Sequence, residues 1–185
     1  MNKEYKTKRL LLKVLDDTYG EKVLEYFHAN KDFLKEWETV RDEQYYTLSF
    51  QRQLLAEDYM KLIDGQRVRL WIFLKDNPDT IIGTISLDNI IRGPFLSCFL
   101  GYRLHKDYLN KGYMTEAVKM IIKIAFTEYK LHRIEANIMP RNLASLKVVE
   151  KAGFVNEGLS RKYLRINGIW EDHIHMVILN EKEVE

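Results

Sequence analysis

Several things that this sequence lacks already restrict what it can be. The 185 residues include one cysteine, three prolines and nine glycines. A single cysteine, Cys98, excludes an internal disulfide and favours a reducing compartment such as the cytoplasm. No repeat, low-complexity tract or Pro/Gly-rich linker is present, so we expect one domain over residues 1–185. The early apolar run "LLLKVL" is too short for a signal-peptide core, and no later run is long enough to span a membrane.

A strong charge of one sign is also lacking. Lysine and arginine number 29 against 27 acidic residues, which gives a formal net charge of +2. We therefore expect neither direct nucleic-acid binding nor membrane association. What the chain does have is 46% hydrophobic and 30% charged residues. That composition is typical of a soluble globular domain with a substantial core.

Apolar periodicity and turn residues predict the order β-α-α-β-β-β-α-β-α-β-β. The expected strands cover residues 9–15, 67–75, 80–90, 95–104, 132–139, 154–166 and 169–179. The expected helices cover residues 19–30, 47–65, 112–128 and 143–153, with a further short helix over 31–37. Asn167-Gly168 between the last two strands predicts a tight hairpin. Together these features predict an α/β (α+β) fold, in which helices flank a mixed, mostly antiparallel sheet of about seven strands.

A lone glycine stands where a helix is expected to begin, in "DYLNKGYMTEAV". The first N–H groups of such a helix are unpaired and carry positive potential, which favours an anion such as a phosphate. Gly112 leaves room for the phosphate, while Lys111 adds a charge and Thr115 a hydroxyl. Neither the P-loop pattern nor the dinucleotide pattern is present. A tight strand-to-helix turn that binds no ligand explains Gly112 equally well from this stretch alone.

Longer stretches together resemble the GNAT acetyltransferase superfamily, and its RimJ/RimL-type branch in particular. They are "GYRLHKDYLNKGYMTEAV", "LHRIEANIMPRNLASLKVVEKAGF" and "INGIWEDHIHMVIL". The resemblance spans nearly the whole chain. It implies a GNAT-like domain that transfers acetyl from acetyl-CoA, without a metal, to a primary amine. The founding members of the branch acetylate N-terminal amines of ribosomal proteins, so a protein N-terminus is the leading acceptor, and a homodimer stays open.

The resemblance also implies where the cofactor binds. In this family the loop before the helix wraps the CoA pyrophosphate with backbone N–H groups, and the preceding strand end pairs with the pantetheine arm. Leu109 and Met114 depart from the family's Q/R-x-x-G-x-G/A pattern, which leaves their side-chain contacts open. Asn142 and Ser145 match its N-x-x-S, which places Asn142 near pantetheine and Ser145 near the CoA sulfur. The implied cofactor residues are Tyr102, Arg103, Leu104, Asn110, Lys111, Gly112, Tyr113, Met114, Thr115, Asn142 and Ser145.

Acetyl transfer requires a neutral amine, a polarised carbonyl and a stabilised thiolate. Backbone N–H groups near Leu100 and Gly101 are candidates to polarise the carbonyl. Many superfamily members carry a glutamate on this central strand, but here "SCFL" has no carboxylate. The nearest acid on the neighbouring strand is Glu135, which alternation places on one face with Asn137. A partly buried Glu135 with a raised pKa would relay a proton through water; alternatively, it pairs with a lysine or arginine and only holds the sheet.

Some relatives use a tyrosine to protonate the thiolate, and that position falls at Val149 here. Ser145 is therefore the expected donor, with Tyr102 and Tyr163 as alternatives. A hydroxyl that serves only the helix start explains Ser145 about as well. Cys98 is expected in the core rather than as a nucleophile. His173 and His175 share a strand face but lack a third ligand, so we expect no metal site.

The acceptor side is expected to combine the segment 31–46 with the hairpin around Asn167-Gly168. Trp37, Tyr163 and Asp172 are the candidate substrate-binding residues, and surface packing explains each one individually. Besides the protein N-terminus, two other classes stay open. One is a small-amine (polyamine or aminoglycoside-like) acetyltransferase, and the other is a non-catalytic CoA-binding regulatory module. An RNA-associated role is weaker, because no RNA-binding module is recognisable.

Overall fold

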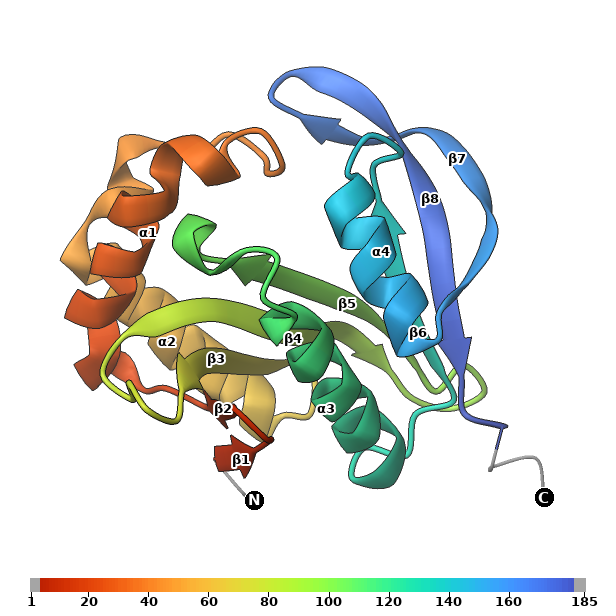
Figure 1. Ribbon diagram of the computed structural model, residues 1–185, viewed down its shortest axis with the longest axis horizontal. Coiled ribbons are helices and arrows are strands. Elements are labelled where there is room, and N and C mark those ends of the chain that lie inside the picture. Colours follow the sequence, from red (N-terminus) through yellow and green to blue (C-terminus); the bar gives the residue numbers. More distant parts are fainter. Residues whose placement is uncertain (1–3, 182–185) are drawn as a thin grey trace.

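An eight-stranded sheet forms the centre of the computed structural model, which describes residues 4–181 (Figure 1). Its strands are β1 (Glu4–Lys6), β2 (Leu10–Lys13), β3 (Val68–Leu74), β4 (Ile81–Ile91), β5 (Ser97–Leu104), β6 (Arg133–Ile138), β7 (Val155–Ile166) and β8 (Ile169–Leu179). Its helices are α1 (Gly20–Leu34), α2 (Leu48–Ile63), α3 (Tyr113–Thr127) and α4 (Leu143–Ala152), with short 3-10 turns η1 (Asp17–Tyr19), η2 (Glu43–Tyr46) and η3 (Lys106–Tyr108).

The strand order is β1-β2-β3-β4-β5-β6-β8-β7. Every neighbouring pair is antiparallel except β5 and β6, which are parallel and are connected through α3. The predicted mixed, mostly antiparallel sheet is therefore confirmed. The strand count is one too low, because β1 was not expected. Three residues, "EYK", are too few to show an alternating pattern, and β1 forms by pairing with β2.

The expected helices over 19–30 and 31–37 are wrong as separate elements, because α1 is one helix from Gly20 to Leu34. No proline or glycine interrupts it. Asn30, which looked like an end, is buried inside the helix and donates from Nδ2 to the Tyr26 carbonyl at 2.7 Å. Its Oδ1 accepts from the Lys106 N–H at 2.9 Å. The helix thereby fixes the turn that follows β5.

Two apolar clusters hold the helices against the sheet. Residues of α3 and α4 pack on one face, and those of α1 and α2 pack on the other (Figure 1). The predicted stripe of α3 is buried at Met114, Ala117, Val118, Ile121 and Ala125, but Ile124 is buried in place of Ile122. Burying a side chain such as Ile121 contributes about 1.5–3 kcal/mol. This packing fixes the direction of α3 and therefore the position of its first turn.

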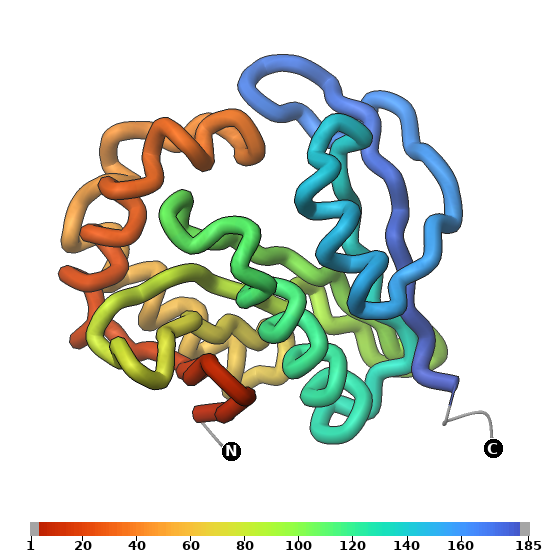
Figure 2. Tube along the Cα trace, viewed as in Figure 1, coloured from red at the N-terminus to blue at the C-terminus, as the bar shows by residue number. Residues whose placement is uncertain are grey.

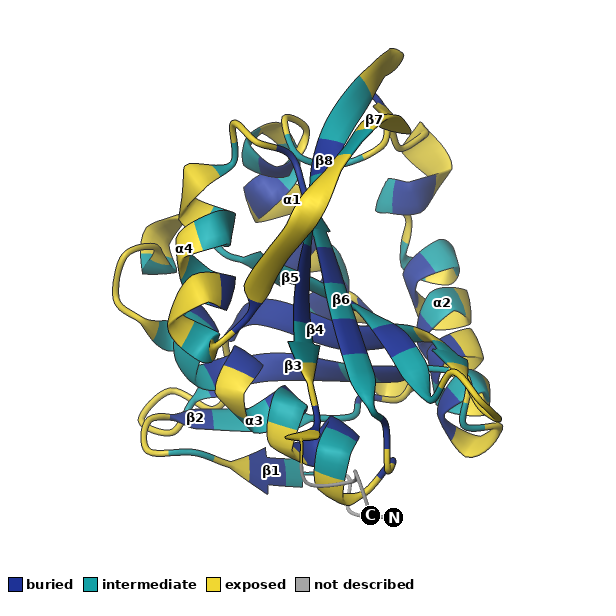
Figure 3. Cartoon of the chain, turned by 90° about the vertical axis from the view of Figure 1, so that its right-hand side faces the viewer, coloured by how far each residue is buried: buried dark blue, intermediate teal, exposed yellow. Residues whose placement is uncertain are grey.

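The β7–β8 hairpin turns at Asn167-Gly168, as predicted, with φ values of 48° and 82°. Two successive positive φ values are the type I′ geometry that suits the twist of paired strands. The hairpin projects at the end of the molecule opposite to the two ends of the described chain (Figure 2). Strand β7 lies at the sheet edge and is exposed along almost its whole length (Figure 3).

Within residues 4–181, no helix combines the length and hydrophobicity that a membrane span needs.

Candidate active site

Strands β5 and β6 begin as a pair and then separate. Their register runs from Ser97↔Arg133 to Phe99↔Glu135 and ends there, while β5 continues to Leu104 along β4 (Figure 1). An inner strand directs its N–H and C=O groups alternately to its two neighbours. Within the described chain, the β6-facing backbone groups of residues 100–104 therefore have no strand partner. An extended ligand arm can pair with them as an added strand does.

Helix α3 starts at this open end of β5 with a glycine in a left-handed conformation. Gly112 is the N-cap residue, with φ 76° and ψ 5°, and no side chain caps the helix. A Cβ at this position would contact only Nη2 of Arg9, at an ordinary 3.5 Å. The backbone conformation, rather than lack of space, is therefore what requires glycine. The first N–H groups of α3 remain open to an anion.

A clamp from the start of β2 holds this loop. The backbone N–H and the Nε of Arg9 donate to the two carboxylate oxygens of Glu116, both at 2.8 Å, and Nη1 donates to the Lys111 carbonyl at 2.9 Å. The guanidinium also lies 4.5 Å from the ring centre of Tyr113. Burial alone would raise the pKa of Glu116, but hydrogen bonds from Thr7 and Arg9 outweigh it, so this pKa lies below its usual value. No local sequence pattern indicates this clamp, because Arg9 and Glu116 lie 107 positions apart.

The lowered pKa of Glu116 predicts how the stability of the clamp varies with pH. The carboxylate stabilises the fold fully above its unfolded-state pKa of about 4.3, and this contribution is lost as the pH falls through the lower folded-state value. We expect Glu116→Gln to lower the free energy of unfolding by about 1–2 kcal/mol at pH 7, because it weakens hydrogen bonds to a charged group. The loss is no larger because Arg9 is half exposed and solvent screens the pair. Urea denaturation should show this difference shrinking below about pH 4. The exposed Glu57→Gln serves as the matched control, and a difference that stays constant across this range would contradict the assignment.

Ser145 lies across the opening from the loop, at the start of α4. Its backbone N–H donates to Oδ1 of Asn142 at 3.1 Å, so the predicted cap is confirmed. Its hydroxyl is not used in that cap, because Oγ lies 2.6 Å from the hydroxyl of Tyr102, which also donates to the Ser145 carbonyl at 3.0 Å. Burial raises the pKa of Tyr102 despite the opposing hydrogen bond with Ser145. The protonated phenol has a single proton, so it donates either to the Ser145 carbonyl or to Oγ; in the second arrangement the serine proton is left for another acceptor.

Other predicted cofactor residues are used within the protein. The Lys111 ammonium donates to the Asp107 carbonyl of its own loop at 2.9 Å, and the Met114 side chain is buried in the core. The side chain of Arg103 is on the opposite face, where its Nε pairs with Glu38. Only the backbone of Arg103 therefore faces the route expected for pantetheine.

A second polar group lies on that opposite face of the sheet. Nδ1 of His175 is 2.7 Å from Oε1 of Glu135, and its Nε2 is 2.6 Å from Oγ of Ser160. Nη2 of Arg133 pairs with the other Glu135 oxygen at 3.0 Å. Burial acts to raise the pKa of Glu135, but hydrogen bonds from Arg133 and His175 outweigh it and lower this pKa. The expected raised pKa is wrong, and the alternative of an arginine ion pair is confirmed.

Tyr163 and Asn137 cover this polar group. The hydroxyl of Tyr163 accepts from Nδ2 of Asn137 at 3.1 Å, and its ring centre lies 5.0 Å from that of His175. Asp172 instead accepts from the Lys162 N–H at 2.8 Å, where the β7–β8 register is irregular. Tyr163 is therefore placed near the opening, whereas Asp172 is occupied in shaping β7.

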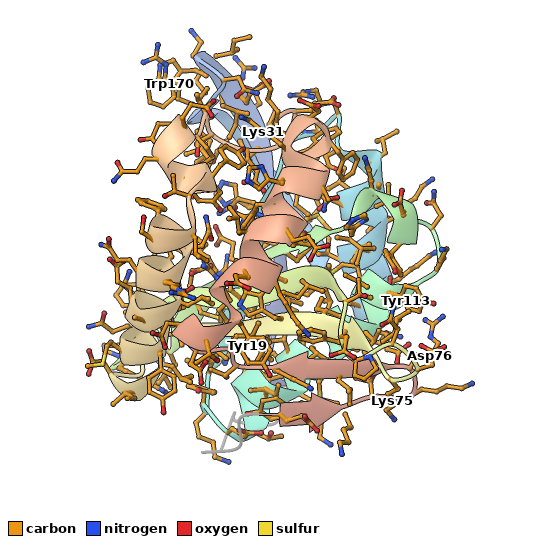
Figure 4. All side chains as sticks on the ribbon, turned by 90° about the vertical axis from the view of Figure 1, so that its left-hand side faces the viewer. Tyr19, Lys31, Lys75, Asp76, Tyr113 and Trp170 are labelled. Atoms are coloured by element: carbon orange, nitrogen blue, oxygen red, sulfur yellow. The ribbon has the colours of Figure 1, made fainter. Side chains whose placement is uncertain are left out.

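Arg141 connects separate segments at the edge of this face. Its guanidinium donates to the carboxylates of Glu36 at 2.9 Å and Glu171 at 3.1 Å. The guanidinium carbon also lies 5.0 Å from the ring centre of Trp37. The Asn167 side chain also donates to the Lys35 carbonyl, so the segment after α1 meets the hairpin. Figure 4 shows Lys31 and Trp170 at this end of the molecule and Tyr113 away from it. The predicted meeting of these two segments is confirmed, although sequence analysis did not identify Arg141.

Cys98 is buried, as expected, and burial raises the pKa of its thiol to about 12, so it is a poor nucleophile. For metals, the side chains of residues 4–181 include no group of three or more His, Cys, Asp or Glu placed to hold an ion.

Comparisons with known proteins agree on one family. The sequence model of the "Acetyltransferase (GNAT) domain" family matches residues 9–155. "Probable N-acetyltransferase YjcK" of Bacillus subtilis is 44% identical over 175 residues, which cover 95% of this chain and 96% of that protein. "[Ribosomal protein uS5]-alanine N-acetyltransferase" of Escherichia coli is 35% identical over 170 residues, covering 91% and 86%. The structure of Mycobacterium smegmatis RimJ in complex with CoA-disulfide superposes with a TM-score of 0.87 at 25% identity, covering 95% of this chain and 84% of that one.

Proposed function

Because this chain belongs to the GNAT acetyltransferase family and is an N-acetyltransferase, we propose that it transfers acetyl from acetyl-CoA to the N-terminal α-amine of a protein. The observation that carries this proposal is the serine hydroxyl of Ser145, held by Tyr102 beside the point where β5 and β6 separate. A CoA sulfur placed there meets a hydroxyl donor that the helix cap does not use.

The proposed cofactor path follows the open backbone groups. The free edge of β5 at residues 102–104 would pair with the pantetheine arm, and the N–H groups at the start of α3 would bind the pyrophosphate. Asn110 and Gly112 both have positive φ, which turns the loop so that it wraps an anion. The CoA disulfide bound by the Mycobacterium smegmatis relative supports this choice of ligand.

The proposed reaction uses both faces of the sheet at the opening between β5 and β6. The amine approaches from the face that carries Glu135 and Tyr163, and the thiolate leaves on the face that carries Ser145. A new N–C bond forms as the C–S bond breaks. N–H groups near Leu100 stabilise the charge on the carbonyl oxygen, and the Ser145 hydroxyl donates to the departing sulfur.

The charge pairing on the acceptor face supports an α-amine over a polyamine. Three carboxylates that could attract a multiply protonated polyamine are already paired with arginines. The pairs are Glu36 with Arg141, Glu38 with Arg103, and Asp88 with Arg67. An α-amine has a pKa of about 7.7–8.0, so roughly a tenth or more is neutral at pH 7, against well under a hundredth of lysine side chains at about 10.4. The alanine acceptor of the Escherichia coli relative makes an alanine N-terminus the first choice.

This choice is tested with a panel of acceptors at equal concentration. We expect a peptide with a free N-terminal alanine to release CoA faster than the same peptide with a blocked N-terminus and a free lysine, and faster than spermidine. Faster reaction of either alternative would disprove the N-terminal assignment but not the acetyltransferase. If acetyl-CoA binds and none of the three reacts, the non-catalytic CoA-binding module becomes the better interpretation.

The proposed location is the cytoplasm. The single thiol, Cys98, is buried and unpaired, which fits a reducing compartment.

A further inference from the structure

Gly101 leaves a gap in the row of β5 side chains on the acceptor face, meaning the sheet face that carries Glu135 and Tyr163. We infer that Ser86 and Asp88 bind the acceptor amine in the space beside Gly101. A primary amine is the ligand class, because its N–H groups are donors and both of these side chains can accept. This inference rests on the proposed function, since it assigns the amine-binding site of that same reaction.

Strand alternation places these groups together on the acceptor face. Leu87 of β4 and Leu100 of β5 are buried in the core beneath α3 and α4, so the residues on either side of each face the other way. The β4–β5 register pairs Ser86 directly with Gly101. Gly101 also lies two residues beyond Phe99, where the pairing of β5 with β6 ends (Figure 1). The space beside Gly101 therefore borders the opening in which the thioester carbonyl is proposed to lie.

The glycine at position 101 is distinguished by the space around it rather than by its backbone conformation. Six other glycines have positive φ, but Gly101 does not. A Cβ at this position would lie 3.3 Å from Oγ of Ser86 and 3.5 Å from Oδ2 of Asp88. Apart from the two residues next to Gly101 in the chain, no other heavy atom of residues 4–181 lies within 4 Å of that point. A ligand atom placed there meets two oxygen atoms from β4 and nothing from β6.

Both oxygen atoms can accept a further hydrogen bond. The Ser86 hydroxyl donates to Oδ2 of Asp88 at 2.6 Å, so the lone pairs of Oγ stay available. Nε of Arg67 pairs with Oδ1 of Asp88, which leaves capacity on Oδ2, and the Asp88 side chain is partly exposed. Since Arg67 offsets the charge of Asp88, the site binds an N–H without strongly favouring the ammonium form, which cannot attack a carbonyl. For the same reason it binds one amine without attracting a polycation.

Asn137 lies across the opening from this space. Continuing the β5–β6 register by two residues places it opposite Gly101. Its Nδ2 donates to the Tyr163 hydroxyl at 3.1 Å, and the Tyr163 ring lies against His175 of β8. Nδ2 is therefore directed away from β5 and Oδ1 toward it. Oδ1 is buried without a hydrogen-bond partner among residues 4–181, so an amine between β5 and β6 would provide the donor that it lacks.

The first test fills the space with a methyl group. We expect Gly101→Ala to lower kcat/KM for an alanine-initiated peptide by about 100-fold, the cost of displacing a reacting group by roughly 1 Å. Acetyl-CoA affinity, measured by calorimetry, should stay unchanged. The new methyl group crowds Oγ of Ser86, so a small loss of thermal stability is also expected. Adding Ser86→Ala to Gly101→Ala should restore the stability but not the activity, because the space remains filled.

The second test uses two substitutions that break the same ion pair. Asp88→Asn removes the charged acceptor and should raise KM for the peptide by about 10- to 100-fold. Arg67→Gln breaks the pair from the other side but keeps Oδ2 of Asp88, so KM should stay unchanged or fall. A purely structural ion pair would instead give both variants the same increase in KM.

The outcomes separate this inference from the proposed function. An equal increase in KM for Asp88→Asn and Arg67→Gln overturns the amine site and leaves the proposed function intact. So does a wild-type KM in Asp88→Asn, or a wild-type kcat/KM in Gly101→Ala. Absence of peptide acetylation by the wild-type protein overturns the proposed function and the amine site with it.

Discussion

Replacing Gly112 with valine is expected to weaken acetyl-CoA binding by about 30- to 150-fold, which corresponds to about 2–3 kcal/mol. The N-cap of α3 has φ 76°, a conformation that a β-branched residue adopts only under strain. The loop would relax, and the N–H groups at the start of α3 would no longer converge on the pyrophosphate. Calorimetric titration with acetyl-CoA measures the effect directly.

Two matched variants separate lost binding from general strain. Gly65 has a similar φ of 68° at the end of α2 with open space around it, so Gly65→Val imposes comparable strain away from the loop. It should leave the acetyl-CoA affinity unchanged. Gly112→Asn should retain most of the affinity, because asparagine tolerates this conformation, as Asn110 does at φ 59° in the same loop. Wild-type affinity in Gly112→Val would rule out the proposed pyrophosphate site.

Replacing Ser145 with alanine is expected to lower kcat by about 10–100-fold with little change in acetyl-CoA affinity, since one positioned donor to the departing sulfur is lost. The helix start should survive, because the cap uses the backbone N–H of Ser145 and the side chain of Asn142. Steady-state kinetics with an alanine-initiated peptide give the split between kcat and KM. Ser49→Ala, at the start of α2, removes a hydroxyl from another helix start and should leave kcat unchanged.

The hydroxyl pair provides a second test of the same donor. If Tyr102 acts only by orienting the Ser145 hydroxyl, then Tyr102→Phe should lower kcat in the wild type and have almost no effect in Ser145→Ala. Losses that simply add would show that Tyr102 acts independently of Ser145. A wild-type kcat in Ser145→Ala would assign the donor role to another group or to water.

Much of the fold was accessible from short stretches of sequence. The stripe of α3, the Asn142 cap and the Asn167-Gly168 turn are set by residues within a few positions of each other, and each is present. The resemblance to the GNAT family is likewise confirmed by the match over residues 9–155. The missed strand β1 and the undivided α1 mark the limit of such patterns. A three-residue strand has too little pattern of its own, and Asn30 looks like a helix end until its buried contacts are known.

The site depended on contacts that no local pattern contains. Glu116 meets Arg9 across 107 positions, Tyr102 meets Ser145 across 43, and His175 meets Glu135 across 40. The sign of the Glu135 pKa shift shows why these contacts decide the chemistry. Burial and hydrogen bonding act on it in opposite directions, and only the arrangement of Arg133 and His175 around the carboxylate determines which is larger. The sequence by itself determined α2, α3 and α4, the Asn167-Gly168 turn and the glycine at the start of α3, because each depends on neighbours along the chain. The tertiary structure alone decided which polar groups face the opening between β5 and β6, because that depends on where distant strands bring them together.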